Sequence, residues 1–343
     1  MRFFFQVISK GYELVVRLRN RLFDEGWLKI HRLKNPVISV GNLTLGGTGK
    51  TPTVITIGKI LQQSGYTVSV LLRGYKGNYR GNPLLVSDGK NLKTNSLIAG
   101  DEALVIAKNL PGALVTVSKN RVKAGKWLER WKPVDVHILD DGFQHRKLYR
   151  CLNLLLIDTT NPFGSGLLFP SGYLREPVKG MERADAIILT RTQTNLNYQP
   201  LINQLQSVKS GIPCFLATQS LVSASERNST GKSVKLPLTG HRVLAFAGIA
   251  NPNQFFNLLR KYQVDLVKTI CFRDHHRYTP RDFTEIQRQC QELEVNTVIT
   301  TEKDIENIPD NSLTSLNVIT VKVAFEFNGS GLPEMVSQTV GRR

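Results

Sequence analysis

From residue 36 onward the chain alternates short apolar runs with longer amphipathic stretches. Apolar runs of this length between turn residues predict buried strands, and stretches with apolar residues three and four apart predict helices. The predicted strands are 37–40, 68–72, 84–87, 114–117, 134–139, 152–157, 186–190, 214–217, 243–247 and 298–301. The predicted helices are 51–63, 101–110, 121–131 and 254–262. This alternation predicts an α/β fold with a mostly parallel sheet and helices on both faces.

The first 34 residues have a different pattern. Apolar residues recur there at helical spacing, and charged residues fall on another face. The apolar positions are Phe4, Ile8, Tyr12, Val15, Leu18 and Leu22. A basic amphipathic helix with aromatic residues is typical of helices that lie in a membrane interface. A surface helix packed on its domain has the same periodicity, and periodicity alone slightly favours that second interpretation.

Residues 219–241 are rich in Ser, Gly, Lys and Thr, which predicts a boundary or an irregular hairpin. The strand and helix pattern resumes after them, and this predicts a second, smaller α/β domain at the C-terminus. We therefore predict an N-terminal amphipathic helix over 1–30, a larger domain over 31–220 and a smaller domain over 221–343.

The chain has 343 residues, a formal net charge of +18 and a pI near 9.9. This charge suits an anionic partner, such as nucleic acid, an acidic membrane surface or a phosphorylated substrate, without choosing among them. The four cysteines form no CxxC pair, so neither a zinc motif nor a disulfide framework is predicted and a reducing, cytosolic setting is expected. No apolar run reaches the ~18 to 20 residues of a spanning helix, and no cleavable signal is predicted.

The segment 36–52, PVISVGNLTLGGTGKTP, predicts a strand that runs into a phosphate-binding loop. Glycines let several backbone N–H groups point at one anion, the lysine reaches the β- and γ-phosphates, and the next hydroxyl binds Mg²⁺. The helix that begins there adds the positive end of its dipole. The predicted nucleotide-binding residues are Thr44, Gly46, Gly47, Thr48, Gly49, Lys50 and Thr51. We therefore expect a P-loop NTPase-like fold, although the strict pattern has glycine at position 44.

A second motif follows another predicted strand, where Asp140 and Asp141 come directly after 134–139 and Gln144 lies in the next turn. A nucleotide fold needs an acidic residue at the end of a neighbouring strand, close to the metal ion. A single aspartate there is often a turn or helix cap. Two in succession opposite a phosphate loop favour a magnesium site formed by Thr51, Asp140 and Asp141.

Together these motifs resemble the tetraacyldisaccharide 4'-kinase family of lipid A synthesis. The resemblance rests first on VGNLTLGGTGKTP followed by DDGFQHRKL at 140–148. Further segments agree along nearly the whole chain and in the expected order. They include LLRGYKG (71–77), GDE (100–102), FPSGYLREP (169–177), FRDHHRYT (272–279) and TEKD (301–304).

The resemblance implies transfer of the γ-phosphate of ATP to the 4'-hydroxyl of a tetraacylated glucosamine disaccharide 1-phosphate, with Mg²⁺ as cofactor. It implies a peripheral enzyme at the cytoplasmic face of the bacterial inner membrane, with the N-terminal helix as its membrane-associating element. The resemblance therefore favours a membrane-interface helix over the packed surface helix that periodicity alone slightly favoured. Nucleic acid is not an expected partner, since no nucleic-acid-binding signature accompanies the charge, and no obligate protein partner is evident.

Residue roles follow from the matching motifs. By resemblance, Asp101 matches the general base, His275 its partner, and Lys50 the phosphate-loop lysine. Further matches are Arg121 as a catalytic residue, Gln144 beside the nucleotide, and Arg175 and Glu176 as substrate residues. Because Asp101 and His275 lie far apart in the sequence, we expect a site between the two domains. The sequence departs from the family at Ala103, where proline is usual, and at Asn120, where aspartate is common.

One alternative from another functional class is a P-loop NTPase that acts as a switch or loads a partner. Its GGTGKT core resembles the loops of such proteins. Members that dimerise through this loop often carry a lysine just before the paired glycines. Here that position is Leu45, which argues against the alternative.

Overall fold

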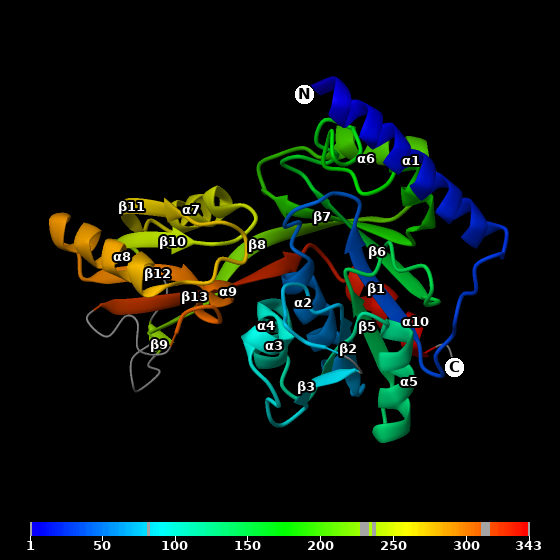
Figure 1. Ribbon diagram of the computed structural model, residues 1–343, viewed down its shortest axis with the longest axis horizontal. Coiled ribbons are helices and arrows are strands. Elements are labelled where there is room, and N and C mark those ends of the chain that lie inside the picture. Colours follow the sequence, from blue (N-terminus) through cyan, green and yellow to red (C-terminus); the bar gives the residue numbers. More distant parts are fainter. Residues whose placement is uncertain (1, 81–82, 227–232, 235–237, 310–315, 342–343) are drawn as a thin grey trace.

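The computed structural model describes residues 2–80, 83–226, 233–234, 238–309 and 316–341. It has a larger and a smaller lobe, joined by two long strands, β8 (Cys214–Glu226) and β13 (Asn317–Phe327) (Figure 1). The larger lobe further contains α1 (Arg2–Asp24), β1 (Val37–Asn42), α2 (Lys50–Gln63), β2 (Val68–Leu72), β3 (Leu84–Asp88), α3 (Ser96–Ala99), α4 (Asp101–Asn109), β4 (Leu114–Val117), α5 (Arg121–Trp131), β5 (Val136–Asp140), β6 (Leu152–Asp158), η1 (Val178–Arg183), β7 (Ala186–Thr192), α6 (Gln199–Val208) and α10 (Gly331–Gly341). The smaller lobe contains β9 (Ser233–Val234), β10 (Arg242–Ala247), α7 (Pro252–Lys261), β11 (Asp265–Cys271), α8 (Pro280–Glu292), β12 (Thr297–Thr301) and α9 (Glu302–Ile305).

One continuous sheet runs through both lobes in the order β11-β10-β12-β13-β8-β7-β6-β1-β5-β2-β4-β3. Most neighbouring pairs are parallel, and the antiparallel pairs are β3 with β4, β8 with β13 and β8 with β9. The predicted α/β class with a mostly parallel sheet is therefore confirmed. Parallel strands buried on both faces read as continuous apolar runs, which explains why the sequence pattern located most of them. The pattern missed β9, β11 and β13; polar and partly exposed residues interrupt β11 and β13.

The central strand β1 lies between β5 and β6, so the strand order reverses beside it. Ligands of open α/β sheets bind at such a reversal, outside the carboxyl ends of the strands. The segment after β1 is the predicted phosphate loop, and Val40 of β1 pairs in register with Asp140 at the end of β5. The topology thus brings the two predicted nucleotide motifs to one edge of the sheet.

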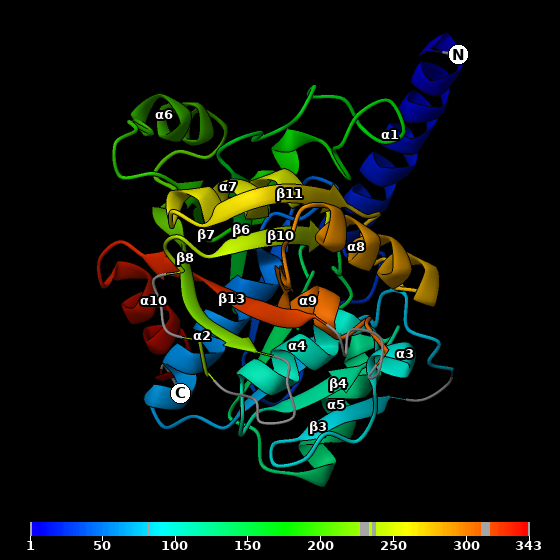
Figure 2. The same cartoon turned by 90° about the vertical axis from the view of Figure 1, so that its left-hand side faces the viewer.

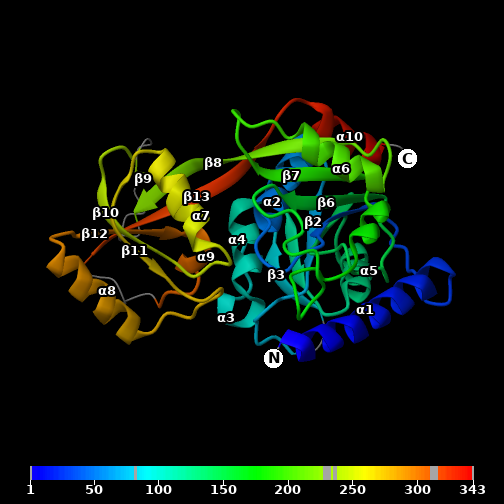
Figure 3. The same ribbon diagram turned by 90° about the horizontal axis from the view of Figure 1, so that it is seen from above.

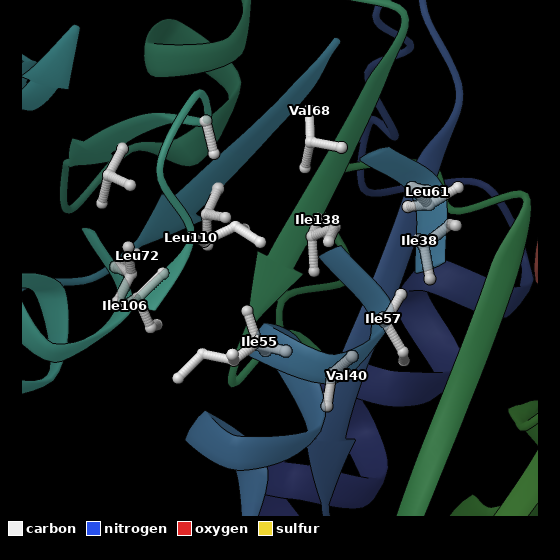
Figure 4. Packing of buried hydrophobic residues seen from close by; sticks show 14 of the residues in the cluster. Ile38, Val40, Ile55, Ile57, Leu61, Val68, Leu72, Ile106, Leu110 and Ile138 are labelled. Carbon is white, nitrogen blue, oxygen red and sulfur yellow. The ribbon is translucent and has the colours of Figure 1, made fainter. Parts of the chain in front are cut away.

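The core beneath this edge is apolar and fully enclosed. In Figure 4, Ile57 and Leu61 of α2 face Ile38 of β1, with Ile138 of β5 nearby. These four side chains have no exposed surface. Their burial fixes α2 against the central strands and so fixes the loop that joins β1 to α2.

The segment 219–241 contains the predicted hairpin, because the end of β8 pairs antiparallel with β9, Ser225 opposite Ser233. The first part of the segment belongs to the long strand β8, which continues to Glu226 and also pairs antiparallel with β13. Residues 227–232 and 235–237 lie outside the described part of the chain. After β13 the chain returns to the larger lobe, where Leu332 and Val336 of α10 join the core around α2. The division at residues 30 and 220 stays a prediction.

The N-terminal helix lies along the outside of the larger lobe (Figure 3). It docks through a face with a seven-residue repeat, in which Ser9, Val16 and Phe23 are buried. The predicted apolar positions mostly lie on the opposite face and remain exposed. The exposed apolar residues are Phe4, Phe5, Val7, Ile8, Leu14, Val15 and Leu18, and we call them the α1 stripe. Tyr12 and Leu22 are exceptions, because both are half-buried, and the Tyr12 hydroxyl donates to the Arg175 carbonyl oxygen at 2.8 Å.

The helix is therefore packed on its domain, as the second interpretation predicted, yet the face that periodicity identified as apolar is not the face that packs. The membrane-interface interpretation stays a prediction. Within the described residues, no helix combines the length and the apolar character needed to cross a membrane.

Candidate active site

A cavity of about 1180 Å³ opens where the carboxyl ends of the central strands face the smaller lobe. The loop after β1 and the end of β5 form one wall, and α7, α9 and the segment after β11 contribute the other. Figure 2 shows this arrangement from the side of the smaller lobe, with α9 next to α4. Most of the predicted site residues line the cavity. These are Gly46, Gly47, Thr48, Gly49, Lys50, Thr51, Arg121, Asp140, Asp141, Gln144, Arg175, Glu176 and His275.

The phosphate loop ends at Gly49, which has a left-handed φ of 89° and directly precedes α2. A Cβ atom at this position would lie 2.2 Å from the Phe325 ring of β13, so both conformation and space require glycine. The Lys50 ammonium lies 3.3 Å from Asn42 Oδ1 and 3.5 Å from Asp141 Oδ1. Its Nζ is therefore held over the loop, next to the acidic pair.

Thr44 does not line the cavity. It is buried and pairs through its backbone with Leu174, and its carbonyl oxygen accepts a hydrogen bond from Asn42 Nδ2 at 2.8 Å. Position 44 thus lies in the wall that supports the loop, outside the part that faces the cavity. This placement explains how the loop keeps its shape without the glycine of the strict pattern.

The end of β7 braces the phosphate loop from beneath, which the sequence reasoning missed. The Thr190 hydroxyl donates to the Thr48 carbonyl oxygen at 3.0 Å, and Arg191 donates to the Gly47 carbonyl oxygen. Arg191 also pairs with Asp158 at the end of β6. Burial lowers the pKa of Arg191 to about 10, which leaves it charged at neutral pH. A charged residue directly after the predicted strand 186–190 was the available signal.

The two aspartates after β5 have different environments. Burial, together with the charges of Glu102 and Asp141, raises the pKa of Asp140 to about 7, and its Oδ1 has no hydrogen-bond partner. Burial also acts to raise the pKa of Asp141, but the charges of Lys50 and Arg175 prevail and lower it to about 2. Arg175 donates to both Asp141 oxygens at 2.8 Å. Asp140 therefore offers a free oxygen, whereas Asp141 is already engaged.

These residues fit a magnesium ion. A buried carboxyl with a free oxygen is stabilised by a divalent cation, which would hold it in its charged form. In the described part of the chain, no group of three or more His, Cys, Asp and Glu side chains is placed to hold a metal. Mg²⁺ in nucleotide sites takes one or two carboxylates and completes its shell with phosphate oxygens and water.

Glu176 is the centre of a buried network on the same side of the cavity. Its carboxylate pairs with Arg183 at 2.6 Å and accepts from Gln144 Nε2 at 3.0 Å and from Asn20 Nδ2 at 3.1 Å. Gln144 Nε2 also donates to the Asn42 carbonyl oxygen at 2.8 Å. The network ties α1 to the turn after β5 and to the end of β1.

Asp101 and His275 meet across the two lobes, as the spacing of their motifs had led us to expect. His275 Nδ1 lies 2.8 and 2.9 Å from the two Asp101 oxygens. His275 has a left-handed φ of 57°, an uncommon conformation for this residue. His276 instead contacts Asp282 at 3.0 Å, so His275 is the partner of Asp101.

The Asp101 carboxylate itself is almost enclosed, with 4% of its surface exposed, and it does not line the large cavity. It also accepts from Asn307 Nδ2 at 3.0 Å and from the Glu102 backbone at 2.8 Å. Burial acts to raise the pKa of Asp101, but the His275 hydrogen bond and the charge of Lys303 prevail and lower it. Asp101 is therefore a charged acceptor next to the imidazole.

Lys303 fixes the proton position on that imidazole, and it is a second residue that sequence reasoning left without a role. Its Nζ lies 3.1 Å from His275 Nε2 and 3.3 Å from Asp274 Oδ1. Burial acts to lower the pKa of Lys303, but the charges of Glu102, Asp101 and Asp274 prevail and raise it. An ammonium only donates, so Nε2 accepts and the ring proton lies on Nδ1, facing Asp101. The segment TEKD contained the signal.

Arg121 supplies further positive charge at the cavity wall. It is buried at the start of α5, and its Nε has no hydrogen-bond partner. Burial and the neighbouring charge of Arg73 lower the pKa of Arg121 to about 10, which still leaves it charged at neutral pH. A buried guanidinium with a free Nε beside a phosphate loop is suited to binding a phosphate oxygen.

Comparison with known proteins identifies the family. The model of the family described as tetraacyldisaccharide-1-P 4'-kinase, LpxK, matches residues 1–341. This chain belongs to that family. The resemblance seen in its motifs is thereby confirmed, and the chain is a kinase that uses ATP and Mg²⁺.

Relatives in the family match over most of their length. A tetraacyldisaccharide 4'-kinase from Pelobacter propionicus is 41% identical over 293 residues, covering 85% of this chain and 79% of that protein. One from Geobacter metallireducens is 39% identical over 298 residues, covering 87% and 86%. The solved structure of "apo" form LpxK from Aquifex aeolicus in complex with ATP is 32% identical, with a TM-score of 0.78 and 99% of each chain covered.

Proposed function

We propose that this chain transfers the γ-phosphate of ATP to the 4'-hydroxyl of a tetraacylated glucosamine disaccharide 1-phosphate, as its family membership suggests. One observation carries the proposal beyond family membership. A single cavity between the lobes is lined by the phosphate loop, by an aspartate with a free oxygen and by His275, whose other side contacts the enclosed Asp101. A nucleotide-dependent switch needs the first two features, but it has no need of a proton acceptor brought in from another lobe.

Lys50 and the loop from Gly46 to Thr51 bind the β- and γ-phosphates in this proposal, and Arg121 adds positive charge from the start of α5. Asp140, with Thr51, would hold Mg²⁺, and Arg175 keeps Asp141 in place. When bound, the metal ion neutralises charge that develops on the phosphate oxygens. Positioning and charge neutralisation are the main requirements of phosphoryl transfer.

His275 and Asp101 accept the proton as one unit. The ring of His275 lines the cavity, with Nε2 next to Lys303 on the cavity side and Nδ1 on the enclosed Asp101. When the 4'-oxygen bonds to the γ-phosphorus, the bond from that phosphorus to the β–γ bridging oxygen breaks and ADP leaves. The hydroxyl proton passes to Nε2 once the substrate displaces Lys303, and Asp101 stabilises the resulting imidazolium.

The proposal is tested with purified protein, radiolabelled ATP, Mg²⁺ and tetraacyldisaccharide 1-phosphate in detergent micelles. We expect labelled lipid that carries the new phosphate at the 4'-position. The matched substrate that lacks only the 4'-hydroxyl should yield none. Release of labelled inorganic phosphate without labelled lipid would contradict the kinase proposal and favour an NTPase switch.

We further propose that α1 binds the cytoplasmic face of the inner membrane. Supporting this, the residues of the α1 stripe are 42% to 69% exposed, and the flanking residues Lys10, Arg17 and Arg21 are exposed cations suited to anionic headgroups. The lipid substrate resides in such a membrane, so an enzyme held at its surface does not have to extract the acyl chains.

Replacing the most exposed part of the α1 stripe tests this second proposal. The variant Leu14→Gln, Val15→Gln, Leu18→Gln introduces glutamine, which is a good helix former, and leaves the docked face of α1 unchanged. We expect binding to phosphatidylglycerol-containing vesicles to fall about tenfold or more, because three exposed apolar side chains are lost. Activity on substrate in detergent micelles should stay near wild type. Unchanged vesicle binding would refute the membrane role.

A further inference from the structure

The loop between β6 and η1 exposes apolar side chains that no step above uses. Residues 159–174 contain no Asp, Glu, Lys or Arg, although 21% of the whole chain is charged. Leu168 and Leu174 are buried and anchor the loop to the core. Between these anchors and beside them, Leu167, Phe169 and Tyr173 point outward, with 47%, 50% and 60% of their surface exposed. We call residues 159–174 the uncharged loop.

The uncharged loop lies against the N-terminal half of α1. The Ser9 hydroxyl donates to the Leu168 carbonyl oxygen at 2.8 Å, and the rings of Tyr12 and Phe169 meet edge to face with centroids 6.2 Å apart. Ile8 lies one helical turn before Tyr12 on the same side of α1. The outward side chains of the loop therefore extend the α1 stripe sideways. Figures 1 and 2 both show the loop segments after β6 beside this half of the helix.

The same loop reaches the cavity at its other end. The backbone N–H of Leu45 donates to the Tyr173 carbonyl oxygen at 2.7 Å, and Thr44 pairs with Leu174. Leu45 is itself exposed and lines the cavity directly before the phosphate loop. An apolar margin thus runs from α1 across the uncharged loop to the mouth of the cavity.

We propose that the uncharged loop is a second membrane-contacting element, which inserts Leu167, Phe169 and Tyr173 into the bilayer interface beside α1. The inference rests on the proposed membrane role of α1. Transfer of leucine and aromatic side chains into the interface is favourable. A loop without charged residues also avoids the cost of burying charges there. Its backbone stays in the interfacial zone, where water and headgroups satisfy the polar groups.

A second membrane contact sets the orientation of the enzyme on the bilayer, in addition to holding it there. A single amphipathic helix fixes depth but lets the attached domain roll about the helix axis. A second contact to one side of that axis prevents this rotation. The uncharged loop lies to one side of α1 and adjoins Leu45. The mouth of the cavity is therefore turned toward the bilayer surface, where the sugar headgroup of a lipid lies.

The test compares two triple variants of the full chain on vesicles of phosphatidylethanolamine and phosphatidylglycerol without substrate. The first carries Leu167→Ser, Phe169→Ser and Tyr173→Ser. The control carries Leu92→Ser, Leu97→Ser and Val222→Ser, which removes equally exposed apolar groups from the β3–α3 segment and β8. We expect the vesicle partition coefficient to fall about tenfold or more in the first variant and to stay near wild type in the control. Both should keep wild-type kcat in detergent micelles.

A second variant distinguishes the loss of a membrane contact from misfolding of the loop. Phe169→Trp keeps an aromatic ring, and its added fluorescence should be quenched by lipids brominated on the acyl chains. Vesicle binding of the serine variant equal to that of wild type, or absent quenching at position 169, would overturn the inference. Lower activity in micelles with unchanged vesicle binding would also overturn it, because the loop would then bind the substrate's acyl chains. Absence of lipid kinase activity in the wild type would instead refute the proposed function.

Discussion

Asp101→Asn should lower kcat by about 10²- to 10⁴-fold while ATP binding is retained. Asparagine can still accept the Glu102 backbone hydrogen bond, so the start of α4 is preserved. Its amide N–H₂, however, donates toward His275 Nδ1, which forces the ring proton onto Nε2. A protonated Nε2 cannot accept the proton of the substrate hydroxyl. The measurement is kcat and KM with lipid in micelles, together with equilibrium binding of ATP.

Asp282→Asn is the matched control for this variant. Asp282 also lies in the first turn of a helix and also contacts a histidine, His276, at 3.0 Å, but neither residue lines the cavity. We expect its kcat to stay near wild type. Equal kcat values for Asp101→Asn and the wild type would show that Asp101 serves only the helix start.

Lys303→Met should lower kcat at neutral pH by about ten- to a hundredfold, because it releases the contact that holds the His275 ring in place next to Asp101. It should also move the acid limb of the pH profile to higher pH. The pKa of Asp101 is lowered in the folded protein, so this carboxylate stays charged until the pH falls through that lowered value. The charge of Lys303 contributes to the lowering, and without it Asp101 takes up its proton at higher pH.

Two further variants test whether the effect comes from the charge of Lys303 and from its position. Lys303→Arg keeps the charge, and we expect it to restore the position of the acid limb. Lys108→Met removes another ion pair between the lobes, 2.5 Å from Glu306, at a distance from the imidazole. Its kcat and pH profile should match wild type. An acid limb that does not move in Lys303→Met would show that Lys303 has no influence on Asp101.

Much of this site was visible in the sequence because phosphate binding is a local property. The residues from Gly46 to Thr51 are consecutive, and backbone N–H groups, a lysine and a helix start need no distant partner to form an anion site. Asp140 and Asp141 were predictable for a related reason, since a buried parallel strand ends directly before them. The structure confirmed the strand pattern and placed both motifs at one edge of the sheet.

The residues that the sequence reasoning missed act at a distance along the chain. Arg191 lies well over a hundred residues from the loop that it braces, and Lys303 of α9 contacts His275 in the loop after β11. Their local signals, a charge directly after a predicted strand and the segment TEKD, do not name the partners that these two cations contact. Their roles arise from β7 lying beside the phosphate loop and from the two lobes meeting.

The sequence by itself determined the strand and helix alternation, the phosphate loop, the acidic pair and the amphipathic character of the first helix, because each depends on residues a few positions apart. Only the tertiary structure decided that α1 docks through Ser9, Val16 and Phe23 and leaves its apolar stripe exposed. It also decided which of the two aspartates has a free oxygen and which nitrogen of His275 carries the proton. Burial, charge and hydrogen bonding at those atoms depend on groups that only folding brings together.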